Sequence, residues 1–417
     1  MALEAIRRVT DQGAYSNLLV PALIERAGLP RRDRDLAAEL AYGTLRRLLP
    51  LDHALGRLLD RPASRAPPRV RAALRLGAYQ VLFTRIPDHA AVAETVGLMD
   101  RGHRGLVNAV LRRLIREGTP QLAGGSARNV SLRTGLARWA VEELRAQLGE
   151  EAELAAAALA TPAPLTLRTN TCRIAVEDMT AALRSAGLEP EVGRIHPGSL
   201  RLPGGRPREL PGFHDGWFAV QDEASAWVVD VLGPQPGDRV LDACAGPGGK
   251  AADIACRSGA VVAGDVSPAR IALMERAAAR LRVRATSLVQ DAARPAVRGC
   301  FDRVLVDAPC SGIGAARRRP ELLWRVRRRD IARLSRLQLE ILTASSELLR
   351  PGGVLVYSVC TFPREETETV CDGLLRAVPE LRPDPFEAPG AGTVERARLW
   401  PHRHGTDAMF VARFRRG

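Results

Sequence analysis

Two cysteines follow two short apolar runs that we predict to be buried strands. Cys310 stands in Val304-Leu-Val-Asp-Ala-Pro-Cys-Ser-Gly, and Cys360 stands in Val354-Leu-Val-Tyr-Ser-Val-Cys-Thr-Phe-Pro. Each run is short, rich in β-branched residues and bounded by turn residues, which is typical of a parallel sheet. Ligands of open α/β sheets bind at the carboxyl ends of the strands, so we expect both thiols to open onto one crevice. Two sulfurs there indicate covalent chemistry, in which one thiol attacks and the other assists.

Lysine occurs once among the 61 lysines and arginines of the chain. This residue, Lys250, closes the glycine-rich segment Asp242-Ala-Cys-Ala-Gly-Pro-Gly-Gly-Lys. An arginine would be planar and bulky there, whereas a slim ammonium group can reach a confined oxygen. The general preference for arginine reflects how the genome encodes basic residues. The single exception, in a glycine-rich loop, favours a functional lysine over one retained by chance.

The same segment reads as a strand, a glycine-rich turn and a helix start. It matches neither the G-x-G-x-x-G nor the Walker A pattern, which disfavours a dinucleotide or a triphosphate. Asp265 ends the next predicted strand, about 20 residues on, where an acidic residue can bond a ribose hydroxyl. Asp291 ends the third, where it could accept from an adenine amino group. One such aspartate could equally be a helix N-cap, but three in series with Asp242 favour an adenosine cofactor without phosphates, for which S-adenosylmethionine (SAM) is the natural candidate.

From Gly216 onward, predicted strands and helices alternate and carry these residues. Helices are predicted over residues 268–280 and 329–349. The predicted strands cover residues 239–243, 260–264, 286–290, 303–306, 354–358 and 409–414. This βαβ rhythm predicts a doubly wound parallel sheet, that is, a Rossmann-like fold of the α/β class.

The rest of the chain divides into two further parts. Residues 1–125 read as all-helical, because apolar residues recur at helical spacing over residues 35–45 and 70–82. After a linker over residues 121–127, a helix (136–148), a strand (165–170) and a second helix (176–186) predict a small mixed segment within residues 126–215. An accessory RNA-contacting role is possible for that segment.

Composition limits the function classes. The 417 residues suffice for two to three domains, and the 46% apolar and 26% charged residues indicate a globular protein. A net charge of +14 favours a polyanionic partner, with nucleic acid ahead of a membrane surface. We find no signal region and no membrane span.

The seven cysteines form an odd set without a C-x-x-C pair, so we expect neither a disulfide nor a zinc site in a cytoplasmic, reduced protein. Cys172, Cys256, Cys300 and Cys371 are then expected to be small buried apolar residues. His402 and His404 lack a third ligand at metal spacing, so we expect no metal.

An arginine-rich segment directly follows the Cys310 loop. Several arginines and one tryptophan over residues 317–329 suit a phosphate track with a stacking surface. The plainer alternative is a solvated helix face with the tryptophan in the core. The residues that we predict to contact RNA are Arg317, Arg318, Arg319, Trp324 and Arg325.

With these motifs, the chain resembles the bacterial RNA cytosine-C5 methyltransferases of the Sun/Fmu type. The motifs that carry the resemblance are residues 244–250, 307–312 and 357–361, Gln221-Asp-Glu-Ala-Ser, and the closing Leu399-Trp-Pro-His-Arg-His-Gly-Thr-Asp-Ala-Met-Phe. The resemblance implies a NusB-like helical domain (1–125), an intermediate segment (126–215) and a SAM-dependent methyltransferase domain (216–417). The family usually has Ala where Gly246 stands and Thr where Ala251 stands, and both changes leave the loop able to cradle a ligand.

The resemblance also implies site residues. Cys360 would be the nucleophile and Cys310 the thiol that helps to release the product. SAM would contact Cys244, Ala245, Gly246, Pro247, Gly248, Gly249, Lys250, Asp265, Asp291 and Asp307. The implied substrate is a cytosine in 16S ribosomal RNA, in a loop or an unfolded segment, because a stacked base cannot reach a thiol. We expect a monomer without metal or membrane partners.

The chemistry accounts for these residue types. C5 of cytosine is a poor nucleophile, and addition of a thiolate to C6 makes it carbanion-like. We expect Cys360 to attack C6, Cys310 to remove the C5 proton after methylation, and Asp307 and Lys250 to bond the N3 or O2 side of the ring.

Four alternatives stay open. The same chemistry could act on tRNA or another rRNA cytosine. A DNA C5 methyltransferase would use the Pro-Cys thiol, here Cys310, as the nucleophile, but the second thiol at Cys360 argues against it. An amino-group methyltransferase would need a polar-Pro-Pro-aromatic loop where this chain has Asp307-Ala-Pro-Cys. The chain could also be a non-catalytic RNA-binding ribosome-assembly factor, against which the intact motifs speak.

Overall fold

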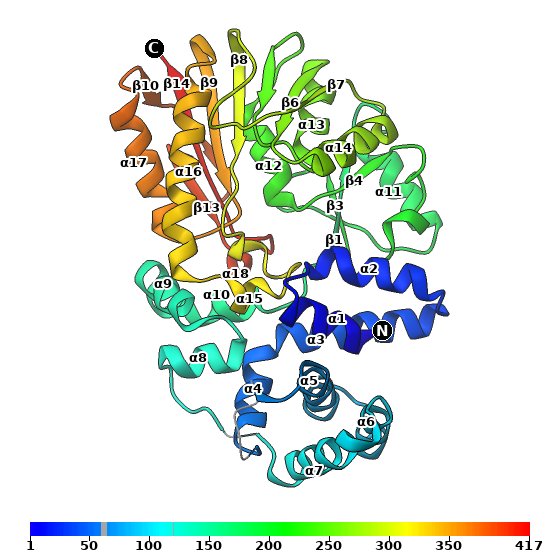
Figure 1. Ribbon diagram of the computed structural model, residues 1–417. Helices are drawn as coiled ribbons and strands as arrows, with labels where there is room; N and C mark the ends of the chain where they lie inside the picture. The colour runs from blue at the N-terminus through cyan, green and yellow to red at the C-terminus, as the bar shows by residue number, and fades with distance from the viewer. Residues whose placement is uncertain (60–64, 120) are drawn as a thin grey trace. The chain divides into compact units, whose positions relative to one another are not determined.

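The computed structural model describes residues 1–59, 65–119 and 121–417 and divides into two compact units. The first unit contains residues 1–162 together with residues 316–327, and the second contains residues 163–315 and 328–417. Figure 1 shows the first unit as helices and the second as sheets covered by helices. No helix in the described part of the chain is long and apolar enough to cross a membrane.

The first unit is helical, as its apolar periodicity predicts. One apolar cluster fills the part of it formed by residues 2–114, with Ile6, Leu51, Leu74 and Leu111 at 0–1% exposure. Its helices are α1 (Ala2–Asp11), α2 (Ser16–Ala27), α3 (Arg31–Arg46), α4 (Leu48–Gly56), α5 (Pro68–Phe83), α6 (Asp88–Gly97), α7 (Arg101–Glu117), α8 (Ala127–Thr134), α9 (Arg138–Leu148), α10 (Ala152–Leu159) and α15 (Leu322–Arg325). The predicted helix over residues 136–148 is confirmed as α9, whereas part of the region read as a linker forms the start of α8.

The segment with α15 comes from a distant part of the sequence yet packs among the first helices. Figure 1 shows it in yellow beside blue and cyan helices. The buried Glu321 carboxylate accepts hydrogen bonds from the Ser16 backbone N–H (3.2 Å) and hydroxyl (2.5 Å) at the start of α2. Because the first N–H groups of a helix lack partners within it, this carboxylate caps α2.

A small four-stranded antiparallel sheet begins the second unit. Its strands lie in the order β2 (Glu191–Val192), β3 (Ser199–Leu202), β1 (Leu165–Thr169) and β4 (Phe218–Val220). Helix α11 (Val176–Ser185) packs on it through Met179 and Leu183, which contact Leu167, Leu200 and Phe218 in one buried cluster. The predicted strand at 165–170 and helix at 176–186 are confirmed. Strands β2, β3 and β4 are not predicted from the sequence, because strands of two to four residues give too little alternation to detect.

The large sheet has eight strands, and its main path runs β10-β14-β9-β8-β5-β6-β7, with β13 paired to β14. Strands β9, β8, β5, β6 and β7 are parallel, and β14 runs antiparallel to β9. The bounds are β5 (Val240–Asp242), β6 (Val261–Asp265), β7 (Ala285–Val289), β8 (Phe301–Asp307), β9 (Leu349–Val359), β10 (Leu381–Pro383), β13 (Arg396–Leu399) and β14 (Met409–Arg416). All six predicted strands are present, but the sheet is mixed rather than fully parallel, because β14 runs antiparallel to its neighbours β9, β10 and β13.

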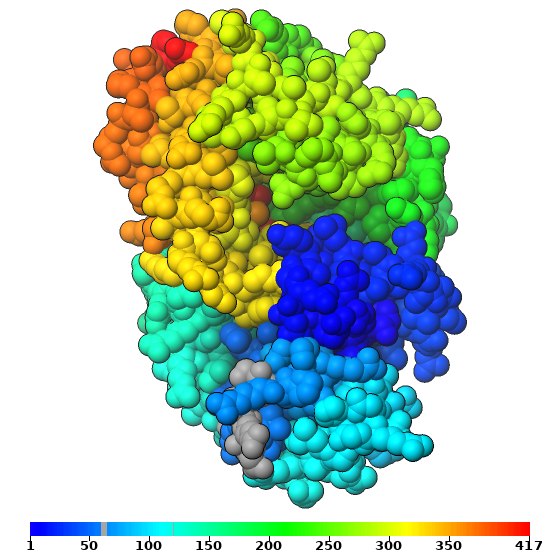
Figure 2. Space-filling view, in the orientation of Figure 1, coloured from blue at the N-terminus to red at the C-terminus, as the bar shows by residue number. Residues whose placement is uncertain are grey.

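Helices cover both faces of this sheet. Leu305 faces α12 (Glu223–Leu232), α13 (Gly249–Ser258) and α14 (Pro268–Leu281) in one apolar cluster. Its neighbours Val304 and Val306 face α16 (Arg328–Ser346) and α17 (Glu368–Ala377) in another. The space-filling view shows little of the red C-terminal strand, because yellow and orange helices cover that face (Figure 2).

Short elements complete the second unit. Strands β11 (Phe386–Ala388) and β12 (Gly392–Val394) form a separate two-stranded ladder, and helix α18 (Pro401–His404) precedes β14. Three-residue 3₁₀ turns lie at η2 (Gly149–Glu151) in the first unit and at η3 (Pro207–Glu209), η4 (Ile313–Ala315) and η5 (Arg364–Glu366) in the second.

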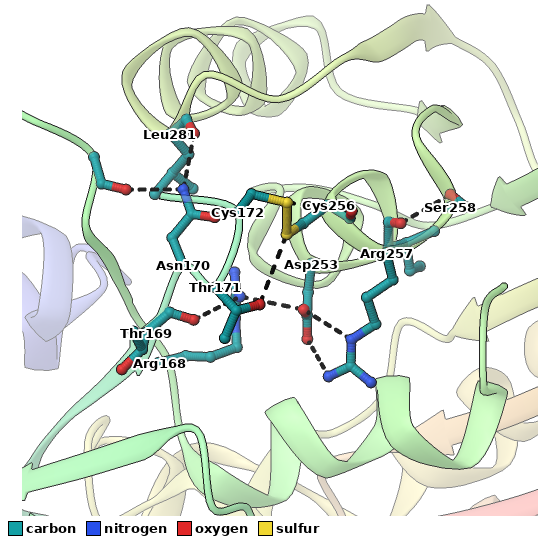
Figure 3. The surroundings of a disulfide bond; sticks show 12 residues. Arg168, Thr169, Asn170, Thr171, Cys172, Asp253, Cys256, Arg257, Ser258 and Leu281 are labelled. Carbon is teal, nitrogen blue, oxygen red and sulfur yellow. Dashed lines mark hydrogen bonds and ion pairs between the residues drawn. A yellow bond between two sulfur atoms is a disulfide. The ribbon is translucent and has the colours of Figure 1, made fainter. Parts of the chain in front are cut away.

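A disulfide joins Cys172, after β1, to Cys256 on α13, across 84 residues of sequence (Figure 3). The prediction of a chain without disulfides is therefore wrong. Cys172 is exposed and bonded rather than a buried apolar residue, and Cys300 is also exposed, whereas Cys371 is buried. The pairing depends on how the small sheet packs on α13, and no spacing of cysteines along the chain reports that packing.

Candidate active site

The site forms where five parallel strands end side by side. Asp242, Asp265 and Asp307 are the last residues of β5, β6 and β8, and Cys360 directly follows β9. Strand order reverses between β8 and β5, because β6 and β7 lie on one side of β5 while β8 and β9 lie on the other. Ligands of open α/β sheets bind at such a switch point. The loop after β5 therefore faces a site shared with the two cysteines.

The structure brings the two sulfur atoms together. The Sγ atoms of Cys310 and Cys360 lie 3.6 Å apart, and both residues are partly buried. The sulfur–sulfur hydrogen bond, followed by burial, raises the pKa of Cys310 well above its ordinary value. Cys310 is therefore a neutral thiol, and its S–H can donate to the Cys360 sulfur.

Lys250 lies beside this pair and is anchored by oxygen atoms. Its Nζ donates to Asp307 Oδ2 (2.6 Å) and to Ser225 Oγ (3.0 Å), and Ser358 Oγ donates to Asp307 Oδ1 (2.7 Å). Burial alone would lower the pKa of Lys250, but Asp307 and the nearby Cys360 raise it above the ordinary value. The lysine is therefore an ammonium group held by the Asp307 carboxylate and the Ser225 hydroxyl.

The glycine-rich loop between β5 and α13 folds tightly against β6. The Ala245 N–H donates to the Gly264 carbonyl (2.7 Å), and the Gly246 N–H donates to Asp265 Oδ2 (3.1 Å). A Cβ on Gly246 would lie 2.4 Å from that carboxylate oxygen. Gly248 has φ +103°, which favours glycine. Glycine at position 246 thus lets the loop approach Asp265 closely.

The other residues between Cys244 and Lys250 that we predict to contact the cofactor lie on the same loop or directly after it. Cys244 is partly buried, and burial raises its thiol pKa. The peptide bond between Gly246 and Pro247 is cis, and α13 begins at Gly249, so its first backbone N–H groups are oriented toward the site.

The three aspartates differ in exposure. Asp265 is buried at 4%, and its Oδ1 also accepts from the Ser267 N–H (2.8 Å). Asp291 is exposed and accepts from the Ala293 N–H (3.0 Å). Asp242 is fully buried, and neither of its carboxyl oxygens has a side-chain hydrogen-bond partner in the described part of the chain.

These features fit SAM. The glycine loop leaves space that a Cβ would fill, Asp265 ends the neighbouring strand, and the buried Asp242 carboxyl lies below the loop. Residues 244–250 would hold the methionine part and Asp265 the ribose, with Asp291 at the third strand end for the adenine.

A buried ion pair supports the cofactor loop from the small sheet. Arg168 on β1 lies 3.2 Å from Asp253 on α13, donates to Gln221 Oε1 (2.8 Å), and is 2% exposed. Asp253 also accepts from Arg257 (3.1 Å), as Figure 3 shows beside the disulfide. Helix α13, which starts at the cofactor loop, is thereby fixed to the neighbouring sheet.

The arginine-rich segment does not lie as the sequence predicts. Trp324 donates through Nε1 to the Leu45 carbonyl (2.9 Å) and packs with Val9, Leu19 and Leu45. Arg325 donates to the carbonyls of Val9 (2.6 Å), Gly13 (3.1 Å) and Ala14 (2.9 Å).

Arg317 is buried, and Arg319 lies over the Tyr15 ring at 5.0 Å. A stacking and phosphate-binding role for Arg317, Trp324 and Arg325 is thus corrected to a structural one within the first unit, since their groups are used in packing. Arg318 is half-buried, and Arg327, Arg328 and Arg329 are exposed.

Several residues of the site are not identified from the sequence as functional. Ser225 lies in a segment noted only for its resemblance, and Ser358 precedes Cys360 by two residues on β9. Glu366, in η5, bonds both cysteine loops. The acidic run that contains it, six residues after Cys360, is a weak signal, because exposed acidic runs look the same.

Fold and site together define a class of protein. A Rossmann-like sheet with a cradle for an adenosine cofactor and a nearby nucleophile is typical of SAM-dependent methyltransferases. Comparisons with known proteins assign the family.

Residues 229–415 match the family 16S rRNA methyltransferase RsmB/F. Residues 1–116 match the NusB family, and residues 136–208 match the ferredoxin-like domain of RsmF/B-like methyltransferases. A putative methyltransferase of Mycobacterium tuberculosis is 38% identical over 100% of this chain and 95% of its own length. A probable ribosomal RNA small subunit methyltransferase B of Bacillus subtilis is 34% identical over 100% of this chain and 98% of its own.

A crystal structure of the protein PH0851 matches with a TM-score of 0.85 at 26% identity, covering 99% of this chain and 97% of that chain. The chain belongs to the 16S ribosomal RNA methyltransferases of the RsmB type, and its cofactor is SAM. The resemblance to the Sun/Fmu enzymes and the NusB-like front domain are thereby confirmed.

Proposed function

We propose that this protein methylates C5 of a cytosine in 16S ribosomal RNA through a covalent bond between Cys360 and C6. The observation that carries the proposal is the pair of thiols 3.6 Å apart at the ends of β8 and β9. One cysteine would suffice for a buried apolar contact. Two at neighbouring strand ends, beside a lysine–aspartate pair, suit addition and elimination on a pyrimidine ring.

The order in which the two thiols react follows from the effect of a charge on Cys360 on the pKa of Cys310. A Cys360 thiolate adds to C6 while the Lys250 ammonium and the Cys310 S–H stabilise the negative charge. Once its sulfur is bonded to carbon, Cys360 no longer carries the charge that helps to raise the pKa of Cys310. Cys310 can then lose its proton to solvent water, and the resulting thiolate accepts the C5 proton of the methylated ring. Breaking the bond between sulfur and C6 returns Cys360 as a thiolate and releases 5-methylcytosine.

Lys250 and Asp307 hold the base. SAM supplies an electrophilic methyl group. The Asp307 carboxylate can accept from the exocyclic amine or a protonated N3, and the Lys250 ammonium can donate to O2, where negative charge accumulates after addition. Ser225 and Ser358 fix both groups, so no reorientation is needed during the reaction.

The substrate is a cytosine in a loop or an unfolded rRNA segment, since a stacked base must leave the helix to reach Cys360. The net charge of +14 and the exposed Arg327, Arg328 and Arg329 support binding to phosphates. We propose a cytoplasmic monomer with domains at 1–125, 126–215 and 216–417, which contain the three matched family segments.

Trapping the intermediate tests this proposal. If Cys310 resolves the adduct, Cys310→Ala produced in cells should migrate in part as a slower, nuclease-sensitive band on a denaturing gel. The double variant with Cys360→Ser should lack the band, and the exposed free Cys300→Ala should behave as wild type. Sequencing the trapped RNA identifies the cytosine, which also separates 16S rRNA from tRNA.

Cys360→Ser alone should lower methyl transfer by about 10³-fold or more, as loss of a covalent nucleophile does. Full turnover by Cys310→Ala without a trapped band would contradict the two-thiol mechanism.

A further inference from the structure

A buried carboxylate that has no step in the proposed chemistry lies beneath the two cysteine loops. Glu366, in η5, is 0% exposed. Its Oε1 accepts from the Ser311 N–H (2.8 Å) and Gln338 Nε2 (3.0 Å), and its Oε2 accepts from Ser311 Oγ (2.5 Å) and Thr361 Oγ1 (3.1 Å). Each oxygen atom thus has two donors, which is the full capacity of an ionised carboxylate.

The donors connect the two nucleophile loops. Ser311 directly follows Cys310, and Thr361 directly follows Cys360. The Ser311 and Thr361 hydroxyls also lie 2.6 Å from each other. One carboxylate therefore ties together two loops that are 50 residues apart in sequence and carry sulfur atoms 3.6 Å apart.

Helix α16 and strand β9 hold this carboxylate in place. Gln338 on α16 donates to the Pro309 carbonyl (3.0 Å) as well as to Glu366. The Tyr357 hydroxyl on β9 lies 2.6 Å from the Glu366 carbonyl oxygen and 3.1 Å from Gln338 Oε1. A satisfied buried polar network of this kind is rigid, because each lost partner leaves an unpaired group in a region of low dielectric.

Hydrogen bonds from uncharged donors surround the Glu366 carboxylate. Burial raises its pKa, and the bonds from Ser311, Gln338 and Thr361 oppose that shift. A neutral side chain could also connect two loops. The two oxygen atoms of the planar Glu366 carboxylate each accept two hydrogen bonds, so this single residue binds four donors from three segments of the chain.

We propose that Glu366 is a positioning residue that sets the spacing of the Cys310 and Cys360 thiols. Its function is to hold Cys310 close to the ring that is bonded to Cys360, so that the adduct is resolved as fast as it forms. This inference rests on the proposed two-thiol chemistry.

The first test measures thiol spacing without RNA or cofactor. A trivalent arsenical, phenylarsine oxide, binds two thiols that lie close together, and the signal of interest is the part lost in Cys310→Ala. It is measured on the full chain without added reductant, so that Cys172 and Cys256 stay paired. Glu366→Gln should weaken this binding by about tenfold or more, because the second thiol no longer adds at high effective concentration.

Neighbouring Glu365 supplies the matched control. It is paired with the exposed Arg328, so Glu365→Gln removes a carboxylate from the same turn and should leave arsenical binding as in wild type. Glu366→Asp keeps the charge but shortens the side chain, and it should give an intermediate loss. If Glu366→Gln does not fold, Glu366→Asp carries the test alone.

The second test distinguishes a role of Glu366 in positioning Cys310 from a role in the stability of the whole site. Misplacing Cys310 while Cys360 remains reactive should let the RNA adduct accumulate in Glu366→Gln, several-fold above wild type, as in Cys310→Ala. A merely structural loss would lower addition and resolution together and give no such band. Binding of a SAM analogue should be unchanged, because the four donors of this network, from Ser311, Gln338 and Thr361, lie outside the glycine-rich loop.

The outcomes distinguish the two proposals. Wild-type arsenical binding in Glu366→Gln would overturn the role of Glu366 whatever the adduct shows. Weakened arsenical binding, with no adduct in Cys310→Ala either, would leave the spacing role standing and overturn the covalent mechanism. Weakened binding in Glu366→Gln without adduct, when Cys310→Ala does form one, would overturn its part in resolution.

Discussion

At the scale of single residues, the site places acids and bases where water is excluded. Asp242 is fully buried, and this burial, with a contribution from the charge of Asp307, raises its pKa from 3.8 to about 7. Lys250 acts in the opposite sense but does not prevent the shift. Near neutral pH the Asp242 carboxyl is thus divided between its two protonation states.

Asp242 predicts a pH dependence of stability. The native state holds a proton on Asp242 that the unfolded chain releases near pH 4, so stability should fall as pH rises from about 4 to about 7. Asp242→Asn removes this titration. Between about pH 5 and about pH 8, the free energy of unfolding of the variant should rise relative to wild type by roughly 2–3 kcal/mol. Urea unfolding at both pH values, without cofactor, measures the difference, and a constant difference would rule out the titration.

At the scale of elements, α13 links the cofactor loop to the small sheet. Lys250 in its first turn reaches Asp307, Asp253 pairs with Arg168, and Cys256 is bonded to Cys172. These three residues are spaced three apart, so each lies about one helical turn beyond the last on the same side of α13. Helix α13 is therefore attached at successive points to the large sheet, to β1 and to the turn after β1.

The disulfide predicts a reductant-dependent stability. Closing a loop of this length limits the unfolded chain, so Cys172→Ser should lower the free energy of unfolding by about 2–4 kcal/mol. Adding dithiothreitol should bring wild type to the level of the variant and leave the variant unchanged. Cys300→Ser, at an exposed free cysteine, should stay within about 0.5 kcal/mol of wild type. Equal stability of wild type with and without reductant would contradict a stabilising bond.

At the scale of the whole molecule, the chain leaves the methyltransferase unit after Ala315 and returns at Arg328. The excursion completes the helical unit, where α15 contributes Glu321, Trp324 and Arg325. The helical unit is therefore not an independent N-terminal addition. Part of its structure is encoded directly after the Cys310 loop.

Removing this contribution should destabilise the helical unit. Glu321→Ala leaves the start of α2 without its buried acceptor, and the expected loss is about 2–3 kcal/mol, because two hydrogen bonds to a charged group disappear. Limited proteolysis should then cut within residues 1–162 at lower temperature than in wild type, while Glu150→Ala, at an exposed position, serves as the control. Unchanged proteolysis in Glu321→Ala would show that the inserted segment is dispensable for this unit.

The sequence by itself determines the methyltransferase sheet and predicts the candidate site residues at its strand ends. The apolar runs before Cys310 and Cys360 and the loop at residues 242–250 are local patterns, because a strand end, a glycine turn and a helix start are encoded by neighbouring residues. For the same reason the sequence predicts the positions of β5 to β9. It also predicts that the two cysteines lie close together, because each follows a parallel strand of the same sheet.

Only the tertiary structure decides the contacts between distant segments. The bond between Cys172 and Cys256, the packing of Trp324 against Leu45, and the four hydrogen bonds of Glu366 each join residues whose separation along the chain carries no periodic signal. The arginine-rich segment shows the consequence: its composition suits a phosphate track, yet burial uses Arg317, Trp324 and Arg325 for packing. The type of a side chain determines which interactions it can make, and its neighbours in the folded protein determine which of these it does make.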